Sequence, residues 1–276
     1  MKPTVANLIS QSRQHGLPAL EARLLLEHAS GLSRTRQAAW PETELDAAVA
    51  ETFRELVRRR LAGEPVAYLI GLREFFSLEF EVSPAVLIPR PETELLVELA
   101  LERLPLDEPS SALDLGTGSG IIPVSLRKHR PQLAMYALDI SETALAVAQR
   151  NAERHQTPIR FARSNWYAAL GEERFDLIVS NPPYIAAGDP HLVEGDLRFE
   201  PAGALSDGAD GLLHIRQIIA GAARHLQPGG WLLFEHGYDQ AAASRALLQA
   251  AGFQQVRSWS DLADIERVSG GRLAAS

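Results

Sequence analysis

The sequence contains no cysteine among its 276 residues. This absence excludes a disulfide framework, a cysteine-ligated zinc and a cysteine nucleophile, and it fits a reducing compartment. Lysine is nearly absent as well, because Lys2 and Lys128 are the only lysines and the other 25 of the 27 basic residues are arginine. The formal net charge is −8, whereas proteins that bind nucleic acid through its phosphates usually carry a basic surplus. We therefore expect no direct nucleic-acid partner.

Long hydrophobic runs are also missing, since no apolar stretch approaches the roughly 20 residues that cross a bilayer. The start Met1-Lys2-Pro3-Thr4 lacks the basic region and apolar core of a signal peptide. The eight histidines are scattered without metal-ligand spacing. The composition, 46% apolar and 22% charged, is that of an ordinary globular protein. We expect a metal-free cytoplasmic protein with no membrane partner, and we expect a monomer.

Residues 1–71 have the apolar periodicity of short helices. One helix is predicted over residues 5–12. Pro18 suits the start of a second helix and Gly31 its end. Pro41 is expected to open a third, in which apolar side chains recur at three- and four-residue spacing as far as Leu61. These features predict a small helical domain for substrate recognition.

The pattern changes at residues 72–89, which we expect to form a β-hairpin linker between two domains. Apolar and polar side chains alternate over residues 76–82, as in a half-buried strand, and residues 86–88 suggest the return strand. Arg90 follows between Pro89 and Pro91, which hold it in an extended conformation. Arg90 could thus be directed at a binding site, although the same residues also suit a simple helix entry.

Residues 90–276 alternate between strand and helix patterns. This alternation predicts a doubly wound α/β domain, with helices on both faces of the sheet. The expected strands lie near residues 112–115, 133–138, 159–162, 175–179, 231–234, 253–259 and 266–273.

A glycine-rich turn follows the first of these strands. It reads Gly116-Thr117-Gly118-Ser119-Gly120, and Asp114 stands two residues before the first glycine. Glycines at this point allow a tight turn and the close approach of a ligand to the backbone. The spacing is G-x-G-x-G, which differs from the dinucleotide, P-loop and nucleophile-elbow patterns.

Polar residues also follow the next two strands. Asp139 ends the second strand, where an acid can accept hydrogen bonds from both ribose hydroxyls; its alternative role is to cap the helix that begins near Ser141. After the third strand, Asn165 could bond an adenine edge and Trp166 could cover the ring. Trp166 could equally be a core aromatic residue.

The fourth strand runs directly into Asn181-Pro182-Pro183-Tyr184. Two prolines exclude both a helix and ladder pairing, so the chain must leave the sheet here. Asn181 is then displayed at the carboxyl end of a strand, where open α/β sheets bind ligands. A planar NH2-bearing group could be held here by the Asn181 amide, backbone carbonyls and the ring of Tyr184. The alternative without a function is a turn that ends the strand.

Taken together, these motifs resemble the class I S-adenosylmethionine-dependent methyltransferases that methylate the nitrogen of a planar amide or amine. Further stretches are similar to the peptide chain release factor glutamine methyltransferase family and distinguish it from adenine-N6 DNA and RNA methyltransferases. These stretches are Phe75-Phe76-Ser77, residues 87–94, residues 180–185, Arg198-Phe199-Glu200-Pro201, Glu235-His236-Gly237 and Glu266-Arg267-Val268.

The resemblance implies that S-adenosylmethionine is held by residues 116–120, Asp139, Asn165, Trp166 and Asn181, and leaves as S-adenosylhomocysteine. It implies that residues 181–184 hold the glutamine of the release factor's Gly-Gly-Gln loop, whose side-chain N5 is methylated in support of translation termination. Of these, Asn181, Pro182 and Tyr184 would be catalytic, and Arg90 would bind substrate. Asn165 departs from the family's usual aspartate, which puts the strength of the adenine contact in doubt.

Two other functions stay open from the residues alone. A nucleic-acid amino-methyltransferase would place an extruded base in the same pocket. A protein that only binds a nucleotide for regulation would need the glycine loop but leaves Asn181 to Tyr184 without a role.

Overall fold

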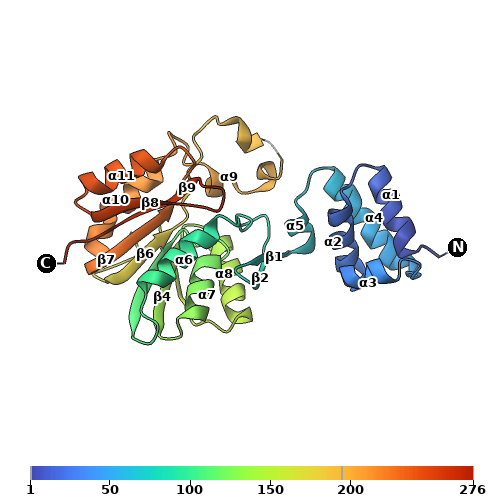
Figure 1. The fold of residues 1–276 in the computed structure, drawn as a ribbon, viewed down its shortest axis with the longest axis horizontal. Helices are drawn as coiled ribbons and strands as arrows, with labels where there is room; N and C mark the ends of the chain where they lie inside the picture. The colour runs from blue at the N-terminus through green and yellow to red at the C-terminus, as the bar shows by residue number, and fades with distance from the viewer. Residues whose placement is uncertain (1, 194, 276) are drawn as a thin grey trace. The chain divides into compact units, whose positions relative to one another are not determined.

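The computed structural model describes residues 2–193 and 195–275, and the chain divides by its internal contacts into two units, Met1–Leu72 and Arg73–Ser276. The first unit is helical (Figure 1). Its helices are α1 (Val5–Gln14), α2 (Ala19–Ser30), α3 (Arg34–Ala39), α4 (Ala47–Leu61) and α5 (Val66–Ile70). Side chains from α1, α2 and α4, among them Leu8, Leu25 and Phe53, form its buried core.

The prediction of the third helix in this unit was wrong at its start. Pro41 opens no helix, and α4 begins at Ala47, while the unpredicted α3 is capped by the Ser33 hydroxyl, which accepts from Arg36 N at 3.3 Å. The segment after Pro41 is used instead to satisfy the first amides of α1. Ala6 N donates to Pro41 O at 2.8 Å and Val5 N donates to Thr43 O at 3.1 Å, so these backbone groups are not available for a helix.

A hairpin of β1 (Leu72–Phe75) and β2 (Leu78–Glu81) starts at the boundary between the two units in the sequence. The predicted strand 76–82 starts two residues too early, because Phe76 and Ser77 form the turn with φ of 50° and 60°, the backbone that two-residue hairpins require. The predicted return strand at 86–88 is absent from this described segment. Ile88 N donates to the Glu200 carboxylate instead of to a neighbouring strand.

The doubly wound α/β architecture is confirmed by a seven-stranded sheet of order β5-β4-β3-β6-β7-β9-β8, in which β9 runs antiparallel to β7 and β8 (Figure 1). The strands are β3 (Ser110–Leu115), β4 (Leu133–Asp139), β5 (Arg160–Arg163), β6 (Phe175–Ser180), β7 (Leu226–Glu235), β8 (Gln254–Ser260) and β9 (Glu266–Arg272). The helices are α6 (Thr93–Arg103), α7 (Ile121–His129), α8 (Glu142–Arg154), α9 (Ala202–Leu205), α10 (Leu213–His225) and α11 (Ala241–Ala250), with short 3-10 turns η1 (Pro190–Val193) and η2 (Leu197–Phe199).

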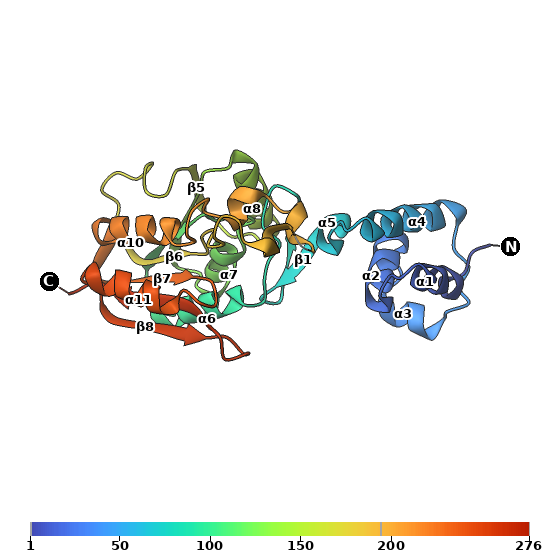
Figure 2. The same cartoon turned by 90° about the horizontal axis from the view of Figure 1, so that it is seen from above.

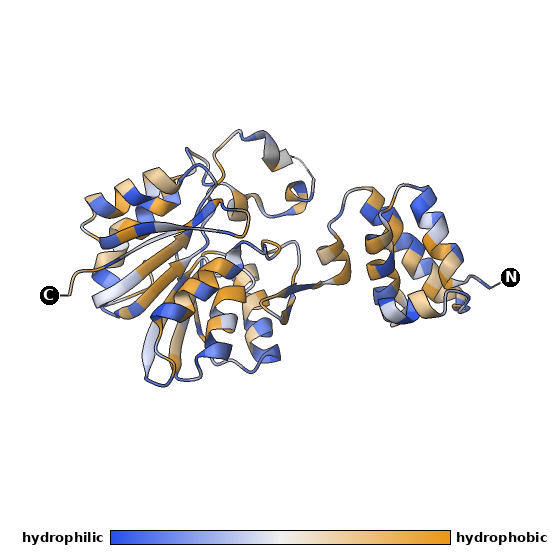
Figure 3. Ribbon diagram, in the orientation of Figure 1, coloured by the Kyte–Doolittle hydropathy of each residue, from blue (hydrophilic) through white to orange (hydrophobic). Residues whose placement is uncertain are grey.

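Two separate apolar cores hold the helices against the sheet. Leu96 and Val97 of α6 and residues of α7 pack on the face that carries Met135, whereas Ile215 and Ile218 of α10 pack on the opposite face. Figure 1 shows α10 and α11 on one side of β6 and β7 and α6 and α7 on the other, Figure 2 shows the same elements from above, and Figure 3 shows much of these strands coloured as apolar. The burial of both faces explains why the central strands have continuous apolar runs.

The register of the central strands brings their carboxyl ends to one edge. Leu115, the last residue of β3, is paired with Leu138 on one side and with Ser180 on the other. The strand order reverses between β3 and β6, because β4 and β5 continue to one side and β7 to the other. A crevice at such a reversal is the usual ligand site of open α/β sheets.

Candidate active site

A cavity of about 430 Å³ lies at the carboxyl ends of β3, β4 and β6. Its size is in the range of small-molecule sites. Most of the residues predicted from sequence line it, which brings together segments from four loops and the start of α6. The predicted residues on its wall are Arg90, Gly116, Thr117, Gly118, Ser119, Asp139, Asn165, Trp166, Asn181 and Pro183. The other three, Gly120, Pro182 and Tyr184, adjoin this wall in the chain without lining it.

The start of the glycine loop is fixed by hydrogen bonds to β4. Leu138 O accepts hydrogen bonds from Gly116 N at 2.8 Å and from Thr117 N at 3.0 Å. Gly116 and Gly118 have φ of 74° and 54°, which side chains disfavour. A Cβ on Gly118 would meet no heavy atom within 4 Å, so its backbone is open to the cavity. Gly120 has a different role, because a Cβ there would lie 3.0 Å from Ala148 Cβ in α8.

Asp139 combines the two roles that the sequence left open. Its Oδ2 accepts from Gly118 N at 2.8 Å and its Oδ1 accepts from Ser141 N at 2.9 Å, so it holds the glycine loop and the start of α8. Burial raises the pKa of this carboxyl, and the backbone hydrogen bonds oppose the rise. Asp139 also lines the cavity, and each carboxylate oxygen keeps a second lone pair for a ligand hydroxyl.

Asp114 lies beneath the loop and is fully buried. Neither of its carboxylate oxygens has a hydrogen-bond partner within 3.5 Å among the described residues, and the same is true of the Thr117 hydroxyl oxygen. Burial, together with the charge of Asp139, raises the pKa of Asp114 to about 7, while the neighbouring Thr117 opposes the rise. Thr117 lines the cavity, whereas the fully buried Asp114 does not, so the Asp114 carboxyl lies behind the wall of the site.

Asn165 and Trp166 occupy the wall beyond β5. The Trp166 ring covers Gly116, since a Cβ on that glycine would be 3.6 Å from Cζ3 of the indole. Trp166 Nε1 donates to Gln217 Oε1 at 2.7 Å, which fixes the ring. Asn165 is exposed and lines the cavity. A flat aromatic wall next to an amide fits a planar heterocycle.

Asn181 is held by a buried chain of hydrogen bonds that starts in α6 and ends in β7. Asn181 Nδ2 donates to Thr93 Oγ1 at 3.1 Å, and Thr93 Oγ1 donates to Glu235 Oε2 at 2.7 Å. A hydroxyl has one proton, and when Glu235 is ionised that proton is given to its carboxylate, so Thr93 can then only accept from Asn181. The Asn181 amide must therefore turn its NH2 group to Thr93, and its Oδ1 has no partner elsewhere in the described chain.

Tyr184 is the last member of this series of hydrogen bonds. Its hydroxyl donates to Glu235 Oε1 at 3.2 Å. Burial and the neighbouring Glu235 raise the pKa of this phenol. Burial also raises the pKa of Glu235 to about 7, with Thr93 and Tyr184 opposing the rise.

Gln240 fixes the backbone of this loop. Its Nε2 donates to Tyr184 O at 2.9 Å and to Gly211 O at 3.2 Å, while its Oε1 accepts from Gly237 N at 2.9 Å. The space is closely filled, since a Cβ on Gly211 would lie 2.6 Å from Tyr184 O. The loop after β6 is therefore rigidly attached to the start of α11.

Arg90 is also positioned by a residue distant in sequence. Its guanidinium pairs with Glu200 Oε1, and Glu200 Oε2 accepts from Ile88 N at 2.9 Å. Burial raises the pKa of Glu200, and the charge of Arg90 opposes the rise. Pro201 follows Glu200 and lines the cavity, as Arg90 does. The Arg198 to Pro201 stretch thus joins the wall of the site to residues 88–90.

Four residues that organise the site were not predicted as site residues, namely Thr93, Glu200, Glu235 and Gln240. Thr93, Glu200 and Glu235 lie inside stretches that carried the resemblance to a family, and that was the available signal for them. Gln240 had none. Within residues 2–193 and 195–275, no group of three or more His, Asp or Glu side chains is arranged to hold a metal, and no helix is long and apolar enough to cross a membrane.

Known proteins are similar to this chain over nearly its whole length. Two family models match, "PrmC N-terminal domain" over residues 6–71 and "Methyltransferase small domain" over residues 92–195. A release factor glutamine methyltransferase of Burkholderia pseudomallei is 56% identical over 99% of this chain and 98% of its own length. Enzymes of the same name from Pseudomonas aeruginosa and Escherichia coli are 48% and 45% identical over 98% and 96% of this chain, and over 99% and 95% of their own lengths.

Solved structures agree at the level of the fold. A methyltransferase from Pyrococcus furiosus superimposes with a TM-score of 0.56 at 20% identity, covering 79% of this chain and 97% of its own. A T. thermophilus 16S rRNA methyltransferase, in complex with AdoMet and guanosine, gives a TM-score of 0.54 at 22% identity over 73% of this chain and 49% of its own.

Proposed function

The chain belongs to the release factor glutamine methyltransferase family, and from this we propose that Asn181 receives the side-chain amide of the glutamine in its active site. The protein is a class I, S-adenosylmethionine-dependent methyltransferase that methylates a release factor glutamine. The observation that carries the proposal is the chain from Asn181 through Thr93 to Glu235, which leaves Asn181 Oδ1 as a fixed hydrogen-bond acceptor.

The acceptor nitrogen needs this help because its lone pair is delocalised into the amide carbonyl. Asn181 Oδ1 and the Pro182 carbonyl accept the two N–H groups of the glutamine amide. Two fixed acceptors stabilise the positive charge that develops on the nitrogen and aim it for in-line transfer. Tyr184 stacks on the planar amide. Its position is fixed by hydrogen bonds from its hydroxyl to Glu235 at 3.2 Å and from Gln240 to its carbonyl at 2.9 Å. Pro183 and Arg90 complete the wall of the substrate site.

The residues around the cavity fit S-adenosylmethionine, which supplies an electrophilic methyl group when bound. The open backbone of Gly118, with Thr117, Ser119 and Gly120 beside it, lets the ligand approach closely. Asp139 accepts from ribose hydroxyls through its second lone pairs.

The adenine end is assigned to Asn165 and Trp166. Asn165 keeps an acceptor oxygen in place of the family's usual carboxylate, so its bond to the adenine amine is uncharged. We expect no metal in this site.

The acceptor glutamine is that of the Gly-Gly-Gln loop of the release factor. Residues 1–71 recognise the release factor, residues 72–89 link the domains, and residues 90–276 carry the chemistry. The enzyme acts as a monomer in the cytoplasm, without direct contact with nucleic acid. The net charge of −8 supports this last point.

Replacement of Asn181 by Ala tests the proposal. With labelled S-adenosylmethionine and intact release factor, kcat should fall by at least about 100-fold, because one of the two acceptors is lost. Affinity for the cofactor should weaken only moderately. Asn7→Ala is the matched control, since Asn7 is an exposed asparagine of α1. Retained turnover in Asn181→Ala would exclude the proposed role, and label in DNA or RNA alone would favour a nucleic-acid methyltransferase.

A further inference from the structure

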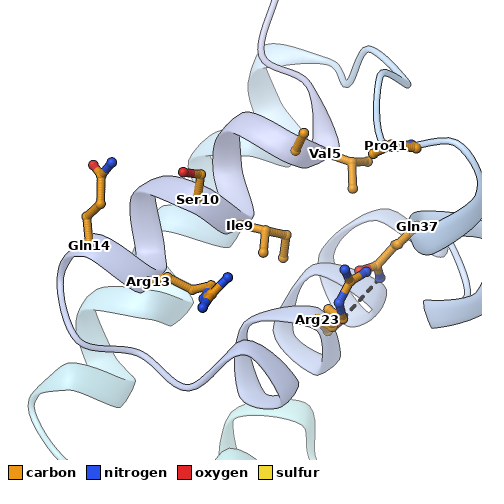
Figure 4. Close-up of a pocket in the computed structure, with 9 residues that line it drawn as sticks. Val5, Ile9, Ser10, Arg13, Gln14, Arg23, Gln37 and Pro41 are labelled. Atoms are coloured by element: carbon orange, nitrogen blue, oxygen red, sulfur yellow. Dashed lines mark hydrogen bonds between the residues drawn. The ribbon is translucent and has the colours of Figure 1, made fainter.

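A second cavity, of about 460 Å³, lies within the helical unit and is open to solvent (Figure 4). Val5 and Ile9 of α1 give it an apolar floor, while Arg13 of α1, Arg23 of α2 and Gln37 of α3 bring polar groups to it. We call it the arginine pocket. It has no part in the chemistry at the sheet edge, since all of its wall belongs to residues 5–41.

The positive charge in this pocket is unusual for the unit, whose other basic residues mostly have acidic partners. Arg34 pairs with Glu27 at 3.3 Å, Arg54 with Glu51 at 3.2 Å and Arg60 with Glu21 at 2.7 Å, and Arg58, Arg59 and Lys2 are also paired. Neither Arg13 nor Arg23 has an acidic partner among the residues that the structure describes. Two arginines without an acidic partner therefore line the same pocket.

Arg23 is also partly removed from water. Its Nη1 is buried and has no hydrogen-bond acceptor in the described chain. Gln37 Nε2 donates to Arg23 O at 3.0 Å and to Leu32 O at 2.9 Å, so its amide orientation is fixed, and its Oε1 is buried without a donor. A guanidinium nitrogen that is buried without an acceptor is costly, and a carboxylate bound to the part of Arg23 that lines the pocket would offset some of that cost.

We propose that the arginine pocket binds the side chain of an aspartate or glutamate on the release factor. Arg13 and Arg23 both line the pocket, and guanidinium groups are well suited to bind carboxylates; Val5 and Ile9 can contact the methylene groups of the same side chain. The pocket is a single recess on a chain with net charge −8, not a basic stripe, so a protein carboxylate fits it better than a nucleic-acid backbone. This inference rests on the proposed role of residues 1–71 in recognising the release factor.

The test uses the full chain with Arg13→Gln and Arg23→Gln combined. KM for intact release factor should rise by about tenfold or more with kcat unchanged. KM for a short Gly-Gly-Gln peptide should not change. Added salt should raise the wild-type KM for release factor and affect that of the double variant much less. Arg36→Gln is the matched control, because Arg36 is an exposed arginine of the same unit outside the pocket.

Arg23→Lys keeps the positive charge and should recover part of the lost affinity, which separates charge from folding. An unchanged KM for release factor in the double variant would overturn the inference and leave Arg23 as a residue that packs beside Gln37. Failure of the wild-type enzyme to methylate both release factor and peptide would instead contradict the proposed function. An equal rise in KM for release factor in Arg36→Gln would show a general effect of charge. It would also overturn the proposal that the arginine pocket binds the release factor.

Discussion

The hydroxyl of Thr93 donates its one proton to Glu235 across 142 positions of sequence, at 2.7 Å, and both residues are buried. This bond decides which way the neighbouring Asn181 amide faces. Glu235 thereby acts on the substrate through two other side chains, without lining the cavity itself. It is a positioning residue in the proposed mechanism.

Thr93→Val should lower kcat by roughly 10- to 100-fold, because Asn181 loses the acceptor that fixes its amide and can turn its NH2 group toward the substrate. KM for S-adenosylmethionine should change little. Thr93→Ser keeps the hydroxyl and should stay within about threefold of wild type. The measurement is steady-state methylation of release factor at saturating cofactor, and wild-type kcat in Thr93→Val would contradict the positioning role.

The rate should depend on the ionisation of Glu235, whose pKa is raised to about 7 by burial. The carboxylate form accepts from Thr93, whereas the acid form can donate to Thr93, which frees that hydroxyl to donate to Asn181 and reverses the amide. Charges near Glu235 are those of Glu92, which raises its pKa, and of Arg267, which lowers it. We therefore expect kcat to fall as the pH drops through about 7.

Glu235→Gln provides the control for that pH dependence. A glutamine can still accept from Thr93 through its oxygen and remains neutral at every pH. Its kcat at pH 8 should be moderately below wild type, and its profile between pH 6 and 8 should be flat. The profile is taken at saturating cofactor, so that titration of Asp114, whose pKa is also about 7, acts on KM. A wild-type fall in kcat that persists unchanged in Glu235→Gln would assign the titration elsewhere.

Stability should respond to the same group with a definite sign. The pKa of Glu235 rises from 4.5 to about 7 on folding, so the folded protein binds more protons than the unfolded chain between these values. The stability associated with this group is complete below about pH 4.5 and is lost as the pH rises to 7, by up to about 3 kcal/mol. The free energy of unfolding of Glu235→Gln, relative to wild type, should therefore increase from pH 5 to pH 8.

Urea unfolding of the ligand-free proteins at several pH values measures this difference. Asp210→Asn is the control, because the ion pair with Arg216 lowers the pKa of Asp210 to about 2 and it stays ionised throughout that range. Its difference from wild type should be constant. A Glu235→Gln difference that is equally constant would mean that Glu235 does not titrate in the window.

The parts of the site that sequence predicted are those with a local cause. Gly118 needs a positive φ, and Asn181 is displayed because two prolines end β6, so both could be found from neighbouring residues. Glu235 and Gln240 could not, because their partners Thr93 and Tyr184 lie 142 and 56 residues away. Such pairs depend on how strands and helices meet after folding.

The errors in the fold have a similar origin. The alternation of apolar and polar residues around Phe76 correctly indicates a pair of strands. The turn, however, is formed by Phe76 and Ser77, and neither residue type predicts a positive φ. Residues 86–88 resemble a strand because Val86 and Ile88 are buried. Val86 N, however, donates to Ser83 O at 3.1 Å, and Ile88 N donates to Glu200, 112 positions away.

The glycines of the loop differ in what they do, and a pair of alanine variants should separate the two roles. Gly118→Ala adds a methyl group in open space within the cavity, at φ of 54°. It should cost about 1 kcal/mol in stability from backbone strain and weaken S-adenosylmethionine binding about tenfold. Gly120→Ala brings a methyl group to 3.0 Å from Ala148 Cβ at φ of 80°. It should cost about 2–3 kcal/mol in stability while the folded fraction binds cofactor nearly normally.

Thermal unfolding and calorimetric titration with S-adenosylmethionine measure the two effects on the same samples. Ala148→Gly added to Gly120→Ala removes the methyl group at 3.0 Å but leaves Ala148 Cα at 3.2 Å, so it should restore only part of the steric loss, relative to the effect of Ala148→Gly alone. If Gly120→Ala were the variant that lost cofactor affinity and Gly118→Ala the one that lost stability, the assignment would be reversed. Gly120 would then be the glycine that the cofactor approaches most closely, and Gly118 the one that the packing of α8 requires.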